Sequence, residues 1–460
     1  MDNQAIKGIR SGMVMQRGQD GRCRIRIQAD ETFSRVKCKD QNGSDIPVFI
    51  KDGELLGIPA GGPYRLDFDG LSYTDIYVGD VWLLAGQSNM EGNGILCDKD
   101  RDFVPREDIR AFYMTDTWAP AKNPLHHCAQ AVDEVHTKIY NAWPQTPGTG
   151  SGPGIAFALK MHEITGVPQG LIACAHGGTA LPHWTPTTKH LGGALSLYGA
   201  MLRRYTENGA NAAGILWYQG CQDAVNQEDA YFTERMTELI DNFRSDFGFS
   251  HPMGRIPVVQ VQLGRWSDEV SGFNFDRSWT AVRRLQLELS DSIPAMDTLA
   301  AVTFRNDDFV HICGEDAWRL GERMAESMAC LKWPEKSASA GLLPYMRIGK
   351  ISFIKNPVHD NSTDIRIHVD NCHGALKAEP YAMGFALASE PDRLESVRRP
   401  YDAYTEGDDV IVRVRMNGAE LSRYLLYYGY GCDPDCNITD GRGLPLPCFG
   451  PVDLSGAATL

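Results

Sequence analysis

Four short apolar runs in this sequence are each followed by residue types that hydrolases use. These residues are, in chain order, a serine, a glycine pair, a carboxamide and an Asp/His pair: Ser88, Gly177 with Gly178, Gln219, and Asp308 with His311. Buried parallel strands read as apolar runs, and functional sites of open parallel sheets lie beyond the carboxyl ends of the strands. We therefore expect these residues to meet at one rim. There they would supply the nucleophile, oxyanion donors, base and orienting acid of a serine esterase.

Ser88 is the candidate nucleophile. It follows a Gly86-Gln87 turn at the end of the apolar run Val81–Ala85. Such a turn exposes the hydroxyl and places the backbone N–H of the serine for contact with an oxyanion. A serine between a strand and a helix is also a common helix N-cap. The residues surrounding Ser88 favour the nucleophile over the cap.

His311 is the candidate base. It precedes an expected helix, and Asp308 stands three residues earlier. At this spacing the Asp308 carboxylate can bond the ring Nδ1–H, which fixes the tautomer and stabilises the imidazolium. Asp307 competes for this orienting role. Four other histidines are also candidates for the base, and the position after the last strand favours His311 over them: His127, His136, His176 and His183.

Three groups are expected to form the oxyanion hole: the Ser88 N–H, a backbone N–H of the Gly177-Gly178 pair, and the Gln219 side chain. A carboxamide suits this task because its N–H groups donate without carrying a charge. Removing one such donor typically costs about 3–4 kcal/mol of transition-state stabilisation. A glycine pair can also be a plain strand-end turn. We favour Gly178 over Gly177 as donor, although the sequence leaves that choice open.

The elements that position these residues alternate between strands and helices from residue 79 onward. The expected strands are Val81–Ala85, Gly170–Ala173, Gly214–Tyr218, Ile256–Val261 and Leu299–Phe304. The expected helices are Ile155–Ile164, Ala194–Tyr205, Ala230–Phe247, Trp279–Leu289 and Asp316–Met328. This alternation predicts an α/β domain with a parallel sheet covered on both faces.

Residues 1–78 and 337–460 have strand patterns instead. In the C-terminal part the expected strands are Met346–Ile354, Asp364–Val369, Ala382–Ala388, Asp409–Arg415 and Tyr424–Tyr428. Leu331–Gly341 is the expected junction. We therefore predict an N-terminal β segment over 1–78, a catalytic domain over 79–336 and a C-terminal β domain over 337–460.

The composition excludes several classes of function. The 460-residue chain has 45 basic and 59 acidic residues and a formal net charge of −14, which disfavours nucleic-acid and anionic-membrane partners. No apolar run approaches the length of a transmembrane helix, and Met1–Gln4 lacks the pattern of a secretory signal. The 12 cysteines are typical of reduced thiols. We therefore expect a cytoplasmic protein.

Several motifs resemble one known family. Gly79-Asp80-Val81-Trp82-Leu83-Leu84-Ala85-Gly86-Gln87-Ser88-Asn89-Met90 is similar to the first block of the sialate O-acetylesterase branch of the SGNH hydrolases. Gly177-Gly178-Thr179 with Trp184 resembles the second block, and Trp217-Tyr218-Gln219-Gly220 resembles the third. Asp308 and His311 fit the Asp-x-x-His of the last block. The resemblance extends over nearly the whole chain, since segments near both ends also match: Met13–Arg17, Gly61–Tyr64, Asp433-Pro434 and Gly443–Pro445.

This resemblance implies an SGNH-type, flavodoxin-like three-layer α/β/α domain with a parallel sheet, plus N- and C-terminal β-sandwich segments. It also implies a serine esterase that removes O-acetyl groups from carbohydrates through an acetyl-serine intermediate, with no metal or organic cofactor. The implied catalytic residues are Ser88, Asp308 and His311. Sialic acid esters and acetylated plant-glycan oligosaccharides are both candidate substrates. The oligomeric state stays open.

Cys221 departs from the family pattern, which often has Glu after Trp-Tyr-Gln-Gly. That Glu is neither nucleophile nor base, so we expect activity to survive and substrate preference to change. We interpret Cys221 as a packing residue. Trp184 and Asp223 are the expected substrate contacts, because both follow site-bearing strands and an aromatic ring suits a sugar face. Two other functions stay open: a catalytically silent carbohydrate-binding protein of the same fold, and an esterase for non-sugar acyl esters.

Overall fold

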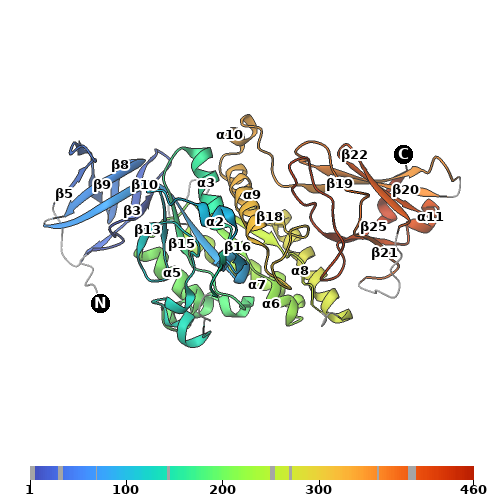
Figure 1. The fold of residues 1–460 in the computed structure, drawn as a ribbon, viewed down its shortest axis with the longest axis horizontal. Coiled ribbons are helices and arrows are strands. Elements are labelled where there is room, and N and C mark those ends of the chain that lie inside the picture. The colour runs from blue at the N-terminus through green and yellow to red at the C-terminus, as the bar shows by residue number, and fades with distance from the viewer. Residues whose placement is uncertain are drawn as a thin grey trace. The chain divides into compact units, whose positions relative to one another are not determined.

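The computed structural model describes residues 6–29, 35–68, 70–141, 146–248, 254–268, 272–359, 362–391 and 400–459. The chain forms two compact units. The first contains Met1–Gln219, Glu234–Val259 and His311–Trp333, and the second contains Gly220–Thr233, Gln260–Val310 and Pro334–Leu460. The first unit begins with strands, which then alternate with helices from β10 (Leu71–Gly86) onward, and strands dominate the end of the second unit (Figure 1). This confirms the predicted α/β class with additional β segments. The three predicted domain boundaries stay predictions.

A mostly parallel sheet forms the centre of the first unit. Its strand order is β13-β12-β15-β10-β16-β17. The bounds are Trp118–Pro120 (β13), Ile109–Phe112 (β12), Gln169–Ala173 (β15), Leu71–Gly86 (β10), Gly214–Tyr218 (β16) and Val258–Gln262 (β17, whose last residues belong to the second unit). β10 runs parallel to both neighbours, with Val81 opposite Gly170 and Ala85 opposite Trp217. The chain visits β12 and β15 on one side of β10 before it crosses to β16. The end of β10 is therefore the switch point at which open α/β sheets bind ligands.

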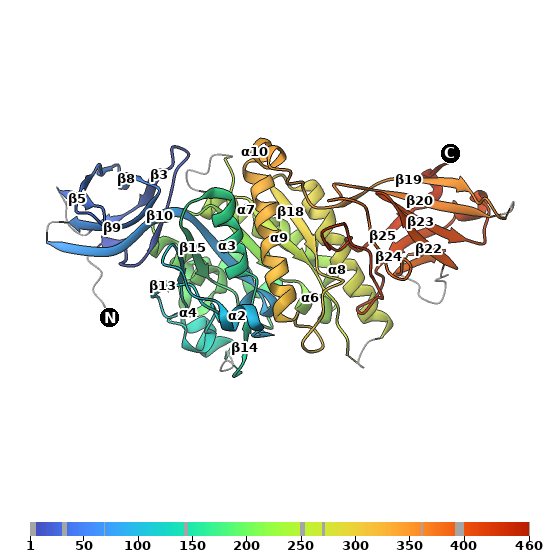
Figure 2. The same ribbon diagram turned by 45° about the horizontal axis from the view of Figure 1, so that its top comes forward.

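One face of this sheet is covered by α3 (Gly154–Thr165) and α9 (Gly314–Lys332). The Trp82 ring meets Phe157 of α3 edge-on, with 5.1 Å between centroids. Lys332 of α9 places its Nζ 5.4 Å over the same indole. α3 and α9 lie side by side (Figure 2), and a side chain at Gly321 of α9 would clash with the Pro153 carbonyl oxygen at the start of α3. Glycine therefore allows this close helix packing.

The opposite face is covered by α5 (Leu197–Glu207) and α7 (Phe232–Phe247). Trp217 pairs with Ala85, which lies three residues after Trp82 and so points to the other face. Its ring packs against Phe243 of α7 at 5.8 Å, and Tyr198 of α5 stacks on Phe243 at 5.8 Å. The first unit is therefore a three-layer α/β/α structure.

The N-terminal strands are continuous with this sheet through β10. Residues 71–78 of β10 pair with β9, and residues 77–79 pair with β2. The N-terminal strands are Ile6–Lys7 (β1), Val14–Gln16 (β2), Arg22–Arg26 (β3), Gln28–Ala29 (β4), Val36–Lys39 (β5), Asp45–Ile46 (β6), Phe49–Lys51 (β7), Glu54–Pro59 (β8) and Gly61–Phe68 (β9). Short elements complete the unit: Ser88–Glu91 (α1), Gly94–Ile95 (β11), Asp98–Asp102 (α2), Thr149–Ser151 (β14) and Gly192–Leu195 (α4).

The second unit ends in two mainly antiparallel sheets, with strand orders β22-β23-β20-β19-β26 and β21-β24-β25. Their strands are Arg347–Lys355 (β19), Thr363–Asp370 (β20), Phe385–Ala388 (β21), Asp402–Glu406 (β22), Asp409–Val414 (β23), Leu425–Tyr428 (β24), Phe449–Asp453 (β25) and Ala458–Thr459 (β26). The other elements are Cys221–Val225 (α6), Phe273–Ser292 (α8), Met296–Ala300 (β18), Pro334–Ser339 (α10) and Gly418–Leu421 (α11). The predicted junction at 331–341 thus contains the short helix α10. Its first residue is proline, which needs no N–H at that position.

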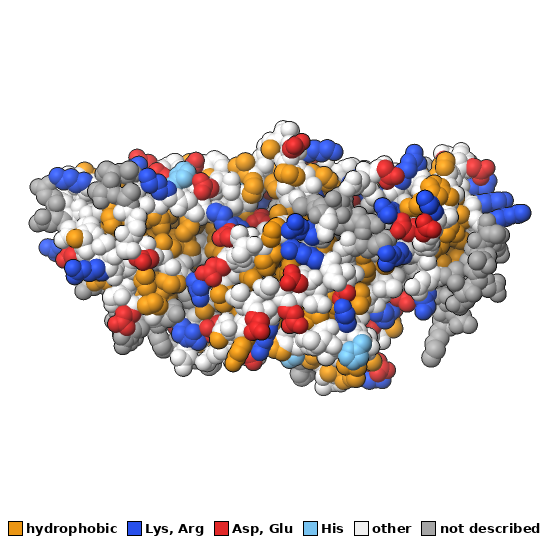
Figure 3. All heavy atoms as spheres, turned by 180° about the vertical axis from the view of Figure 1, so that it is seen from behind, with side chains coloured by type: hydrophobic (Ala, Val, Ile, Leu, Met, Phe, Trp, Pro, Cys, Tyr) orange, Lys and Arg blue, Asp and Glu red, His pale blue; other side chains and the backbone are white. Residues whose placement is uncertain are grey.

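On the face drawn in Figure 3, acidic and basic side chains are interspersed and the basic ones do not gather in one area. None of the helices in the described residues is long and apolar enough to cross a membrane.

Candidate active site

The loops after β10 and β15 lie against each other at the carboxyl edge of the sheet. The His176 N–H donates to the Gly86 carbonyl at 3.0 Å. A Cβ added to Gly177 would lie 3.4 Å from the Cβ of Ser88. Two of the four predicted segments are therefore in direct contact, because their strands are parallel neighbours that end at the same edge.

Gln219 joins this rim from the end of β16. Its side chain is fully buried, and its Nε2 donates to the Thr179 carbonyl at 3.0 Å. The Thr179 hydroxyl in turn donates to the His176 carbonyl at 2.8 Å. The loop after β15 thereby fixes the orientation of the Gln219 carboxamide.

Ser88 is the first residue of the short helix α1, and 7% of its surface is exposed. Gly86 before it has a φ of +128°, and a Cβ at that position would clash with the Tyr218 carbonyl oxygen. Only glycine tolerates this combination. Gln87, not Ser88, occupies the N-cap position of α1. The N-cap interpretation of Ser88 is therefore excluded, and its hydroxyl is not used for capping.

The two glycines of the next loop differ in their N–H groups. The Gly177 N–H donates to Glu91 Oε2 at 2.5 Å. Gly178 has a φ of +67°, with open space where a Cβ would be. Within the described part of the chain, its N–H makes no backbone hydrogen bond. The Gly177 N–H is thus engaged by the protein, and no backbone hydrogen bond engages the Gly178 N–H in the described residues.

His311 is tied to the Ser88 turn through its neighbour. The Ile312 N–H donates to Asn89 Oδ1 at 3.0 Å, and Asn89 directly follows Ser88. The loop before α9 therefore reaches the same rim as the loops after β10 and β15. This joins residues that lie more than 200 positions apart in the sequence.

Glu91 is a carboxylate that the sequence analysis missed. It lies three residues after Ser88 in α1, on the same side of the helix. Burial raises the pKa of Glu91 to about 7, while bonds from the Gly177 N–H and the Cys128 thiol and the charge of His311 act in the opposite direction. The one sequence signal was an acidic residue within an otherwise uncharged stretch after the strand.

Asp308 lies in the second unit, three residues before His311. It is exposed, and its Oδ1 accepts the Val310 N–H at 2.8 Å, a local turn common for aspartate. Asp307 is exposed as well. The choice between the two carboxylates as partner of His311 stays a prediction.

The other candidate histidines are engaged elsewhere. His136 and His176 share an Nδ1···Nδ1 hydrogen bond of 2.9 Å. Burial lowers the pKa of His176 to about 4 and that of His136 far below its usual range. The pKa of His127 is also lowered by burial. His183 accepts the Ala180 N–H at its Nδ1. These partners and environments favour neutral imidazoles.

Trp184, Asp223 and Cys221 are all buried. The Trp184 indole N–H donates to Thr179 Oγ1 at 3.0 Å, and its ring meets Trp217 edge-on at 5.3 Å. Burial raises the pKa of the Cys221 thiol to about 12, which keeps it protonated. The thiol is therefore a poor nucleophile. The substrate contacts of Trp184 and Asp223 stay predictions.

The family of the chain follows from a match over more than half of its length. A family model described as carbohydrate esterase, sialic acid-specific acetylesterase, matches residues 78–330. The chain belongs to this family. The predicted resemblance is confirmed, and the protein is a carboxylic ester hydrolase that deacetylates carbohydrates.

Two relatives illustrate the similarity. A probable carbohydrate esterase of Arabidopsis thaliana is 27% identical over 266 residues, which cover 54% of this esterase and 89% of the plant protein. The crystal structure of a carbohydrate acetylesterase from Xanthomonas citri superimposes with a TM-score of 0.68 at 20% identity, covering 96% of this chain and 98% of that one. The second likeness shows that the fold extends over nearly the full chain.

Proposed function

We propose that this esterase hydrolyses O-acetyl groups of carbohydrates through an acetyl-enzyme formed on Ser88. The observation that carries the proposal is the contact of the Ser88 turn with both the Gly177-Gly178 loop and the loop of His311. A nucleophile, backbone donors and an imidazole on one rim are the parts that acyl transfer needs. The residue-level contacts above support these roles.

In the proposed reaction, Ser88 Oγ attacks the acetyl carbonyl carbon while His311 accepts the hydroxyl proton. The Asp308 carboxylate would orient the ring and stabilise the imidazolium. The tetrahedral intermediate collapses, the bond from carbon to the sugar oxygen breaks, and His311 returns the proton to that oxygen. Water then attacks the acetyl-serine along the same path, which releases acetate and restores Ser88.

The proposed oxyanion donors are the Ser88 N–H, the Gly178 N–H and the Gln219 side chain. Gly178 is favoured over Gly177 because the Gly177 N–H already donates to Glu91. The bond from Gln219 to Thr179 supports its role by holding the amide in place. A preorganised donor of this kind loses no energy to reorientation during the reaction.

Acetylated sialic acid is the substrate class that the family description favours, and acetylated plant-glycan oligosaccharides are the alternative. We also propose that the enzyme works in the cytoplasm. The support is that all 12 cysteines are free thiols, as expected in a reducing compartment. Cell fractionation with an antibody to the protein tests this location.

The first experiment measures acetate release from 4-nitrophenyl acetate and from acetylated sialosides, xylo-oligosaccharides and manno-oligosaccharides. Ser88→Ala should reduce acetate release by at least about 10⁴-fold. Ser339→Ala, at an exposed serine of α10, is the control and should keep full activity. Equal activity of Ser88→Ala and wild type would exclude Ser88 as nucleophile.

The same panel separates the alternative functions. A folded wild-type protein that binds the glycans and releases no acetate would be the silent carbohydrate-binding protein. A preference for long acyl chains over acetyl would identify an esterase for non-sugar esters.

A further inference from the structure

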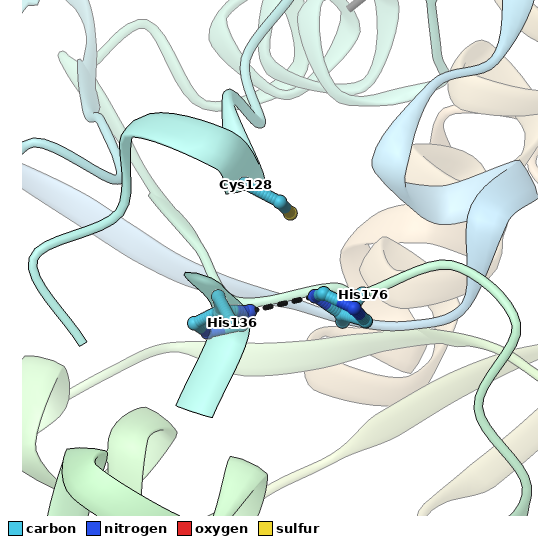
Figure 4. Close-up of side chains that lie close together, drawn as sticks. All are labelled: Cys128, His136 and His176. Carbon is cyan, nitrogen blue, oxygen red and sulfur yellow. Dashed lines mark hydrogen bonds between the residues drawn. The ribbon is translucent and has the colours of Figure 1, made fainter. Parts of the chain in front are cut away.

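Three side chains of types that ligate metals lie close together: Cys128, His136 and His176 (Figure 4). Cys128 begins a 3₁₀ turn (Cys128–Gln130), His136 lies in a π-helical turn (Val135–Ile139), and His176 follows β15. All three are at least 96% buried, and their possible ligand atoms lie within 4.8 Å of one another. All belong to the first unit. The family mechanism proposed above uses none of them.

The three possible ligand atoms lie within 4.8 Å of one another, so a zinc ion could draw them into a tetrahedral site by small side-chain movements. With Zn–N bonds of about 2.0–2.1 Å and a Zn–S bond of about 2.3 Å, two nitrogens lie about 3.3 Å apart and sulfur lies about 3.6 Å from each. The two Nδ1 atoms of His136 and His176 are 2.9 Å apart. An ion would need the two rings to separate by about 0.4 Å and the Cys128 sulfur to settle about 3.6 Å from each nitrogen, within the 4.8 Å that now spans the group.

The donor set also matches zinc chemically. Thiolate and imidazole are the ligands that Zn²⁺ prefers in proteins, and carboxylate-rich sites suit Mg²⁺ or Ca²⁺ instead. In the structure, one Nδ1 donates to the other, so the two imidazoles share a single hydrogen at this position. A metal ion would bind between the two Nδ1 atoms once that hydrogen moves to Nε2 of the same ring. Each imidazole keeps one proton in this exchange.

We propose that Cys128, His136 and His176 bind one zinc ion per chain. Binding releases one proton, which comes from the Cys128 thiol as it becomes a thiolate ligand, while both imidazoles stay neutral. A water molecule completes the tetrahedron. The ion fixes the 128–136 segment to the start of the glycine loop.

This site would position the oxyanion loop without touching substrate. His176 directly precedes Gly177. In the structure the Cys128 thiol donates to the Ala175 carbonyl at 3.3 Å, and in the loaded site the Zn–S bond would replace this hydrogen bond. The ion would therefore hold the start of the loop that carries Gly178, through His176. Zinc binding itself does not depend on the proposed function, whereas an effect of zinc on acetate release rests on it.

The test measures metal content and cobalt spectra of the full-length protein. The protein is stripped with a chelator and titrated with Zn²⁺, and the bound metal and released protons are counted. Co²⁺ is then used as a probe, because thiolate ligation gives a charge-transfer band and tetrahedral geometry gives intense visible bands. We expect one ion per chain, one released proton and both sets of bands.

Variants identify the ligands. Cys128→Ser should abolish the charge-transfer band. Both Cys128→Ser and His136→Asn should weaken zinc binding at least about tenfold, since loss of a residue that only supports a ligand already costs that much. The matched control is Cys174→Ser, which replaces another buried thiol two residues before His176 and should bind zinc like wild type. Ser88→Ala should also bind zinc like wild type, so failure of the zinc site is distinguishable from failure of the proposed nucleophile.

Two outcomes would overturn the proposal. One is a folded wild-type protein that retains no stoichiometric zinc at micromolar concentrations of the ion. The other is a cobalt charge-transfer band that survives in Cys128→Ser. If both ligand variants fail to fold, the stoichiometry and cobalt spectrum of the wild-type protein decide alone.

Discussion

The rim of the parallel sheet and the antiparallel sheets of the second unit bury different kinds of side chain. At the rim, the polar residues Ser88, His176 and Gln219 are buried, and the side chains of His176 and Gln219 make hydrogen bonds. In β20 the buried side chains include Ile365, Ile367 and Val369, and the intervening residues 366 and 368 are less buried. Polar groups are thus enclosed at the rim, whereas β20 mainly buries aliphatic side chains and leaves His368 and Asp370 exposed.

This difference follows from sheet architecture. Helices cover both faces of the parallel sheet, so its strands are mainly apolar, and the candidate site residues follow the strand ends. An antiparallel sheet with one covered face alternates buried and exposed residues along each strand. The comparison indicates that changes at the rim should affect catalysis and changes in β20 should affect stability.

The largest effect is expected for the base. His311→Asn removes the proton acceptor and should lower kcat by about 10⁴-fold, because triad members act as a unit. Thermal unfolding should change little. Steady-state kinetics with 4-nitrophenyl acetate measures the loss, and His190→Asn, at an exposed histidine, is the control. A kcat within tenfold of wild type would show that another group is the base.

A smaller loss is expected for the oxyanion donor. Gln219→Leu keeps the volume of the side chain and removes its N–H groups. We expect kcat to fall by about 10²–10³-fold with a modest change in KM, since the donor acts on the transition state. An increase in KM at constant kcat would instead assign Gln219 to substrate binding.

Glu91 is expected to make stability depend on pH. Its pKa is raised from 4.5 to about 7 by burial, so the folded protein keeps the proton after the unfolded chain has lost it. Its contribution is fully favourable below about pH 4.5 and is lost as pH rises toward 7. The unfolding free energy of Glu91→Gln lacks this loss. As pH rises from about 4.5 to about 7, the variant should therefore gain up to about 3 kcal/mol of unfolding free energy relative to wild type.

Urea unfolding of both proteins measures this gain. It is carried out at about pH 4.5 and about pH 8, the two ends of the titration range. Glutamine retains an oxygen that can accept the Gly177 N–H, so the comparison isolates the charge. An equal difference between the two proteins at both pH values would contradict the raised pKa.

The smallest expected effect is a loss of unfolding free energy from a substitution in the second unit. Ile367→Val removes one buried methylene from β20 and should cost about 0.5–1.5 kcal/mol of unfolding free energy. It should leave kcat/KM unchanged. Ile215→Val, at a fully buried site of β16, is the matched change under the rim. A change in kcat/KM for Ile367→Val alone would break the contrast between the two regions.

Sequence periodicity located most elements of the first unit well. The predicted helix Ile155–Ile164 is observed as Gly154–Thr165, and the predicted strand Gly170–Ala173 as Gln169–Ala173. The strand β12 (Ile109–Phe112) was missed because Arg110 interrupts its apolar pattern. Arg110 is nevertheless buried, since its guanidinium donates to Gly12 and Glu107. Only the folded chain supplies those partners.

The last strand of the α/β pattern was placed too late. It was predicted at Leu299–Phe304 and lies at Met296–Ala300. Residues 301–304 form a turn, in which the Phe304 N–H donates to the Ala301 carbonyl at 3.1 Å. An apolar run marks burial, and burial continues through this turn. Hydrophobicity alone therefore could not find the end of the strand.

The sequence by itself determined the family, the α/β class and the segments that carry Ser88, Gly178, Gln219 and His311. It could do so because apolar runs mark buried strands and because the polar residues after them stand in short motifs. Tertiary structure alone decided that Glu91 engages Gly177 and that Cys128, His136 and His176 converge. Those contacts join segments with no shared motif or spacing, and only the order of strands in the sheet brings them together.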